Sequence, residues 1–158
     1  MVISDGIDDL FELSALYRTA REALELMMDR RFHSGNVCTV AQLRTPLLLK
    51  ELEGRSDLIA KEIRELAAHD KKKDTQYCET LYHYLTCCRS LKKTCDALFT
   101  HRNTVLYRIR RIEDDFAIPL DEPAAHADLL VGVSLLLFKE KGPDFFLHTI
   151  DNNDREGQ

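Results

Sequence analysis

Apolar positions recur at helical spacing along most of the chain. In residues 8–30 they lie three and four apart, as expected for the buried face of an amphipathic helix. Similar patterns predict further helices at residues 43–69 (one or two helices), 75–88, 91–98, 102–116 and 124–139. The chain has only 6 glycines and 4 prolines, so few positions interrupt these helices. The pattern therefore predicts a mainly α fold.

One short segment departs from the helical pattern. The sequence HSGN at residues 33–36 breaks the first helix, and VCTV at residues 37–40 is β-branched enough to predict a strand. A single strand leaves backbone groups unpaired on both edges, and the rest of the chain offers little that resembles a partner. We therefore expect residues 1–42 to be the end of a larger domain that begins outside this chain.

Helix start and stop signals divide the middle of the chain. Pro46 suits a first helical turn, Gly54 suits a helix stop, and Ser56 or Asp57 suits a new N-cap. The charged sequence DKKKD at residues 70–74 predicts a solvated hinge. Four helical patterns follow this hinge in short succession.

Composition restricts the class of protein. The 158 residues suffice for one ordinary domain, or for a small domain with part of another. The N-terminus is acidic and unlike a signal peptide, and the apolar run at residues 129–138 is too short to span a bilayer. The 5 cysteines are odd in number and form no C-x-x-C pair, which favours a reducing cytoplasm. His83 and Cys87 could share a helix face, but no second pair completes a site, so we expect no metal and no cofactor.

Charge is distributed unevenly along the chain. The net charge is −5, yet residues 89–111 hold seven basic residues and one acid, a local balance of +6. Residues 112–158 hold eleven acids and three bases, a balance of −8. Such asymmetry would orient the protein on a polyanion, because only the basic face tolerates one.

The basic segment reads as a helix, a turn and a second helix over residues 91–116. Ser90 suits the first N-cap, and the small Cys95 lies where a tight helix crossing needs a small side chain. The second helix has a core stripe of Val105, Ile109, Ile112 and Phe116.

The opposite face of this second helix gathers polar groups. At about 100° per residue, Asn103, Tyr107 and Arg110 lie opposite the stripe, with Thr104 and Arg111 on one flank. Such groups bridge phosphates and read base edges in a major groove, and a helix inserted N-terminus first would present them to it. Arginine-rich helix faces are also often merely solvated, so charge and periodicity alone leave both interpretations open.

Arg108 borders the core stripe and has two possible roles. It could contact a phosphate, or it could clamp two helices by pairing with an acid such as Glu79 or Asp128.

Three segments carry a resemblance to a known family: TLYHYLTCC at residues 80–88, the string HRNTVLYRIRRIE at residues 101–113, and the apolar LLVGVSLLL at residues 129–137. Over roughly residues 75–140 the chain resembles the C-terminal helix-turn-helix domain of the PucR/CdaR transcriptional regulators. Cys95 departs from the family pattern, which usually has alanine there. Residues 4–42 are similar, more loosely, to the end of a degenerate GGDEF-like domain, without the GGDEF signature.

The resemblance implies a domain plan and a function. Residues 1–42 would be the GGDEF-like remnant, 43–73 a helical linker, 74–140 the helix-turn-helix domain and 141–158 a tail. The chain would bind double-stranded DNA as a homodimer or higher homo-oligomer, with a small-molecule effector sensed by a region absent from it and no membrane contact. The DNA-binding residues would be His101, Arg102, Asn103, Thr104, Tyr107, Arg108 and Arg111.

Two other classes of function remain as alternatives. The apolar helix at 124–139 and the sequence DFFLHTI at 144–150 could form a protein-docking or dimerisation face without DNA binding. An enzyme is the weaker alternative. The adjacent acids Asp8–Asp9 and Asp114–Asp115 diverge on a helix, and the histidines are scattered without a partner nucleophile.

Overall fold

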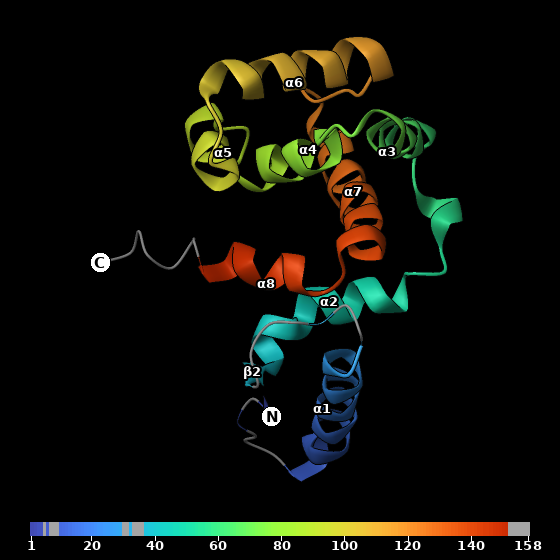
Figure 1. Ribbon diagram of the computed structural model, residues 1–158. Helices are drawn as coiled ribbons and strands as arrows, with labels where there is room; N and C mark the ends of the chain where they lie inside the picture. Colours follow the sequence, from blue (N-terminus) through green and yellow to red (C-terminus); the bar gives the residue numbers. More distant parts are fainter. Residues whose placement is uncertain (5, 7–9, 30–31, 33–36, 152–158) are drawn as a thin grey trace. The chain divides into compact units, whose positions relative to one another are not determined.

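The computed structural model describes residues 1–4, 6, 10–29, 32 and 37–151. These residues form eight α-helices, short 3₁₀ turns and one pair of two-residue strands (Figure 1). The chain divides into two compact units, which we describe separately: a first unit of Met1–Glu53 with Phe138–Gln158, and a second unit of Gly54–Leu137. The predicted mainly α fold is confirmed. The predicted break at 33–36 lies outside the described residues.

The first unit contains a small parallel sheet. β1 (Val2–Ile3) pairs with β2 (Cys38–Thr39), with Val2 opposite Cys38. The predicted strand is confirmed in its two middle residues, but its partner comes from the N-terminal end of this same chain. We expected the strand at residues 37–40 to have no partner within the chain, and the structure shows that it has one. The strand therefore gives no support to the inference that part of a domain is missing.

The helices of the first unit pack around α2 (Val40–Glu51). α1 (Leu13–Met27), preceded by the 3₁₀ turn η1 (Leu10–Glu12), packs against α2, and its Ala23 and Leu26 are fully buried. α8 (Asp144–Asp151) also packs against α2.

Helix α2 begins earlier than the apolar pattern predicts. The Thr39 hydroxyl accepts a hydrogen bond from the Gln42 N–H at 3.2 Å, and the Gln42 side-chain oxygen accepts one from the Thr39 N–H at 2.9 Å. This capping box starts the helix at Val40. Pro46, which we expected in the first turn, therefore lies inside the helix, where its missing N–H removes one backbone hydrogen bond.

The second unit holds four complete helices and most of α7 (His126–Lys141). α4 (Tyr77–Thr86) packs against α3 (Lys61–Lys73), α5 (Leu91–Leu98) and α6 (Arg102–Phe116), as Figure 1 shows. The predicted bounds of α5 and α6, residues 91–98 and 102–116, are confirmed.

The core of the second unit draws on every one of these helices except α5. Fully buried apolar side chains include Ile63, Leu66, Leu81, Leu85, Val105, Ile112, Leu120, Val133 and Leu137. Since Ile63 and Leu66 come from α3, this helix shares one core with α4 and α6. The 3₁₀ turns η2 (Ser56–Leu58) and η3 (Pro123–Ala125) precede α3 and α7.

Residues 71–74 are solvent-exposed, as their charge suggests, but residues 70–74 do not form a hinge. α3 continues to Lys73, and Asp70 is buried. The Asp70 carboxylate accepts hydrogen bonds from the N–H groups of Tyr77 at 3.0 Å and Cys78 at 2.8 Å, and from the Thr75 hydroxyl. Asp70 therefore caps the first turn of α4 from the end of α3 and fixes the junction of the two helices.

Two further features bear on the sequence interpretation. All five cysteines lie in the described residues, and none of them forms a disulfide. Among the described residues, no helix combines the length and the apolar character that crossing a bilayer requires.

Candidate nucleic-acid interface

Helix α5 has a defined cap at each end. The Ser90 hydroxyl accepts a hydrogen bond from the Lys93 N–H at 3.4 Å, so the predicted N-cap is confirmed. After Leu98 the backbone turns left-handed at Phe99, with φ = 49°, and the Thr100 N–H donates to the Cys95 carbonyl at 3.0 Å. The chain turns within Phe99–His101, so that α6 begins at Arg102.

The small buried side chain of α5 is Thr94 rather than Cys95. Thr94 is fully buried, and its hydroxyl donates to the Ser90 carbonyl at 2.8 Å, whereas Cys95 is only half-buried. A threonine can take this position because its own helix satisfies its hydroxyl.

Helix α6 presents a buried face and an exposed face. Val105, Ile109 and Ile112 are buried, which confirms the predicted core stripe for these three residues, and Phe116 is half-buried. The stripe packs α6 onto α4 and α3 and fixes which side of the helix faces outward.

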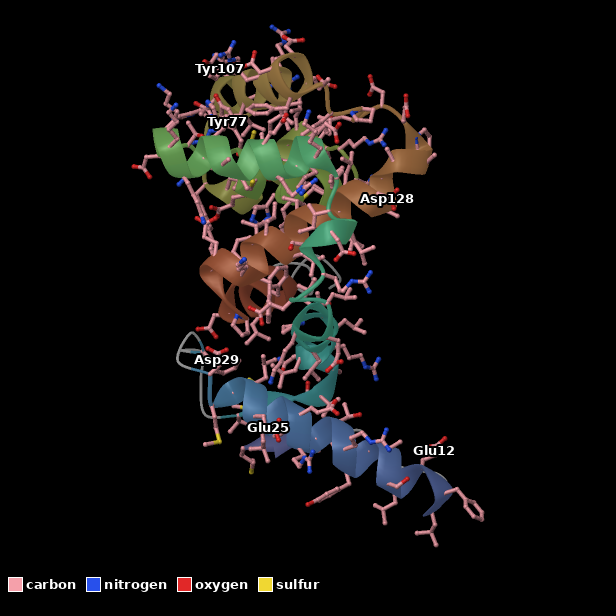
Figure 2. All side chains as sticks on the ribbon, turned by 90° about the vertical axis from the view of Figure 1, so that its right-hand side faces the viewer. Glu12, Glu25, Asp29, Tyr77, Tyr107 and Asp128 are labelled. Atoms are coloured by element: carbon pink, nitrogen blue, oxygen red, sulfur yellow. The ribbon has the colours of Figure 1, made fainter. Side chains whose placement is uncertain are left out.

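Most of the predicted site residues are on the exposed face. His101, Arg102, Asn103, Thr104 and Arg111 are exposed. Tyr107 is 57% exposed; it extends from α6, while Tyr77 belongs to the neighbouring helix α4 (Figure 2). The first two turns of α6 thus offer a guanidinium, an amide, a hydroxyl and a phenol together.

Arg108 is directed differently from these residues. Its guanidinium donates one hydrogen bond to the Thr80 hydroxyl at 3.2 Å and another to the Gln76 side-chain oxygen at 3.0 Å. Both partners belong to α4 or its N-cap. Arg108 therefore joins α6 to α4 through neutral groups rather than through the acids that the sequence suggested.

Arg111 lies further along α6, where it forms an ion pair. Its guanidinium is 2.8 Å from the Asp115 carboxylate, one helical turn away, and the negative charge of Asp115 raises the pKa of Arg111. Among the predicted site residues, Arg108 and the exposed Arg111 already have protein partners, whereas the other five lie at the N-terminal end of the helix.

An aromatic cluster supports the C-terminal half of α6. The His69 ring stacks on Tyr77 with ring centroids 5.3 Å apart, and Phe116 meets the His69 ring edge-on at 5.4 Å. These three rings come from α3, α4 and α6 respectively. They hold the C-terminal end of α6 in place. The N-terminal turns of α6 do not contribute a ring to this cluster and are anchored by the buried Val105.

The outer face is suited to a polyanion. The Thr104 N–H donates to the His101 carbonyl at 3.0 Å, but the His101 side chain makes no capping hydrogen bond, so the N–H groups of Arg102 and Asn103 are left for an external acceptor. Lys92 and Lys93, exposed on α5, and Arg110 add positive charge. These three were left out of the predicted site although the charge count of residues 89–111 already included them.

A family model described as the PucR C-terminal helix-turn-helix domain matches residues 77–135. That range contains α4, α5, α6 and the first part of α7. The fold, the exposed face of α6 and this match together define a DNA-binding helix-turn-helix domain of the kind that transcriptional regulators carry.

The chain is also similar to a named regulator. It shares 29% identity over 142 residues with the proline-responsive transcriptional activator PutR of Bacillus subtilis (strain 168). The match covers 88% of this chain and 34% of PutR, so the chain spans about a third of that relative's length. No solved structure matches the chain.

Proposed function

We propose that this chain is the DNA-binding part of a cytoplasmic transcriptional regulator of the PucR/CdaR type, in which α6 reads the major groove. The observation that carries the proposal is the exposed set of Arg102, Asn103, Thr104 and Tyr107 on the first two turns of α6. The core stripe and Arg108 fix α6 on its support, so these side chains reach a partner without rearrangement of the helix.

The roles of the site residues follow from their positions. Arg102 and Asn103 lie on the first turn, where a helix inserted N-terminus first meets base edges; arginine suits guanine and asparagine suits adenine. His101, Thr104 and Tyr107 suit the phosphates on either side. Arg111 forms an ion pair with Asp115. To contact DNA it would have to break this ion pair and bind a phosphate group instead.

The regulator would act as a homodimer or higher homo-oligomer. A single short recognition helix contacts few base pairs, which is too little to select one site among many. Two copies on repeated or palindromic half-sites double the number of bases read.

The N-terminal residues fit the end of a regulatory GGDEF-like domain, and any helical linker after it ends before Gly54 rather than at residue 73, because α3 belongs to the core of the second unit. The support is the exposed apolar surface of the first unit, where Phe11 is 92% exposed, Leu10 80% and Tyr17 71%. Exposed apolar side chains of this size suit a surface that more of the same domain covers. A small-molecule effector would then bind outside residues 1–158.

The alternative of a docking module built on residues 124–139 receives less support. Val131 of this segment is 48% exposed, but Leu129, Val133, Leu135, Leu137 and Phe138 are buried, so the apolar surface left for a partner is small.

The test is DNA binding by the whole chain, measured by fluorescence anisotropy on a duplex that the chain selects from a random-sequence pool. Arg102→Ala should weaken binding by about 1–3 kcal/mol without changing the circular dichroism spectrum. Arg64→Ala, at an exposed arginine of α3, is the matched control and should bind as the parent does. Failure of the parent chain to select any duplex would refute the proposal.

A further inference from the structure

Phe99 lies in the turn of the helix-turn-helix in an unfavourable backbone conformation. Its φ is 49°, in the left-handed region that disfavours a bulky side chain. The Phe99 N–H donates to the Asp96 carbonyl at 3.3 Å and the Thr100 N–H donates to the Cys95 carbonyl at 3.0 Å. This is the Schellman arrangement, whose left-handed position is usually glycine. A phenylalanine here therefore opposes folding relative to a glycine.

The aromatic ring does not offset that cost through burial. The Phe99 side chain is 91% exposed, so it transfers almost no apolar surface out of water. Asp74 after α3, Cys88 and Arg89 after α4, and Ala117 after α6 also have positive φ, and of these four only Arg89 has a long side chain, which is polar rather than aromatic. Folding therefore does not account for an aromatic ring at this position.

The position of Phe99 in the domain indicates what the ring contacts. It lies three residues before Arg102, at the end of the domain where α6 begins. Duplex DNA offers apolar groups beside its phosphates, namely the C5-methyl group of thymine in the major groove and the carbons of deoxyribose. We infer that Phe99 is a DNA-contacting residue whose ring packs against one of these apolar groups when α6 docks; this inference rests on the proposed function.

The surroundings of Phe99 favour DNA over a protein as its partner. The exposed residues beside it in sequence or on α5 are charged or polar: Lys92, Lys93, His101 and Arg102 are basic, and Asp96 is the one acid among them. A protein-docking surface has an apolar centre made of several side chains. A single ring in a mainly basic and polar surface suits duplex DNA, which is anionic overall and has small apolar groups in its groove.

The test compares Phe99→Ala and Phe99→Gly with the parent chain on the selected duplex, at several salt concentrations. Both variants should bind about tenfold more weakly. The slope of log affinity against log salt should not change, because no phosphate contact is lost. Phe99→Gly should also raise the melting temperature by a few degrees, since it relieves the backbone. Binding and stability would thus move in opposite directions, which a merely structural residue would not produce.

A thymine-to-uracil duplex separates the two DNA groups. If the ring contacts a thymine methyl, removing that methyl weakens the parent chain and leaves Phe99→Ala unaffected. If it contacts deoxyribose, neither protein responds. Leu58→Ala, at a leucine of η2 that is 60% exposed, is the control and should bind normally.

Two results would overturn the inference while leaving the proposed function intact. One is that Phe99→Ala and Phe99→Gly bind as tightly as the parent while Arg102→Ala does not. The other is that weaker binding is accompanied by a lower melting temperature in both variants. A parent chain that selects no duplex would remove both the inference and the proposed function.

Discussion

Three arginines in one short stretch of α6 have three different surroundings. Arg108 donates to Gln76 and Thr80, Arg110 is exposed, and Arg111 pairs with Asp115. Helical spacing places each residue on a side of the helix, but a guanidinium on a long flexible stem can still reach inward or outward. The side of Arg108 could therefore be predicted from the sequence, and its partners could not.

Arg108 should contribute mainly to stability. Arg108→Ala removes two hydrogen bonds from a charged donor, so the free energy of unfolding should fall by about 1–2 kcal/mol. Arg108→Lys should also destabilise the domain, because one ammonium group cannot reproduce two diverging bonds. Urea unfolding measures both, with Arg110→Ala as the control that leaves stability unchanged. Parental stability together with a salt slope reduced by about one would instead assign Arg108 to a phosphate.

Glu113 of α6 should make stability depend on pH. Burial, followed by the negative charges of Asp121 and Asp114, raises the pKa of Glu113 in the folded protein. Its ionised form therefore opposes folding at neutral pH, and this cost disappears as pH falls through the raised pKa. Glu113→Gln should be more stable than the parent at pH 7 by a few tenths of a kcal/mol, because solvent screens the site. Thermal melts should show the advantage shrinking at acid pH; an advantage that grew there would refute this explanation.

Among the helices, a helix start can be predicted from the sequence when the capping residue lies next to it, and not when the cap comes from another helix. The bounds of α5 and α6 follow from local signals, among them Ser90, which caps its own helix. The start of α4 depends on Asp70, seven residues before Tyr77 in a different helix. The charges of residues 70–74 led us to expect a solvated segment. The sequence does not show that one of these carboxylates, that of Asp70, is buried.

Asp70 should be the residue of that run on which stability depends. Asp70→Ala leaves the N–H groups of Tyr77 and Cys78 without their acceptor, which should cost about 2–4 kcal/mol. Asp70→Asn should also destabilise the domain, because an amide group supplies one acceptor oxygen where the carboxylate supplies two. Urea unfolding of these variants and of the exposed control Lys72→Ala measures the effect. Equal stability of Asp70→Ala and Lys72→Ala would contradict the capping role.

For the whole molecule, the question is where the DNA-binding domain begins. The sequence places its start near residue 74, after a helical linker. The compact second unit begins at Gly54, and α3 contributes Ile63 and Leu66 to its core. Apolar periodicity identified α3 as a helix, but periodicity does not show which neighbour covers the apolar face.

Truncation distinguishes the two boundaries. A fragment of residues 54–141 should melt cooperatively and at a higher temperature than a fragment of residues 74–141. The shorter fragment loses the three buried apolar side chains Ile59, Ile63 and Leu66, and the cap of α4, although its remaining helices can still close on one another. Differential scanning calorimetry of both fragments provides the comparison. Equal melting temperatures would place the boundary at residue 74.

Dimethyl sulfate interference can show whether α6 enters the major groove with its N-terminal turn. The reagent methylates guanine N7 in the major groove and adenine N3 in the minor groove, so one experiment reports on both grooves. The selected duplex should lose affinity for the parent chain when guanines are methylated within each half-site. Arg102→Ala should become insensitive at one of those guanines, because its lost partner is the guanine N7 and O6 edge. Interference confined to adenines, or an identical pattern for the parent and Arg102→Ala, would contradict the account.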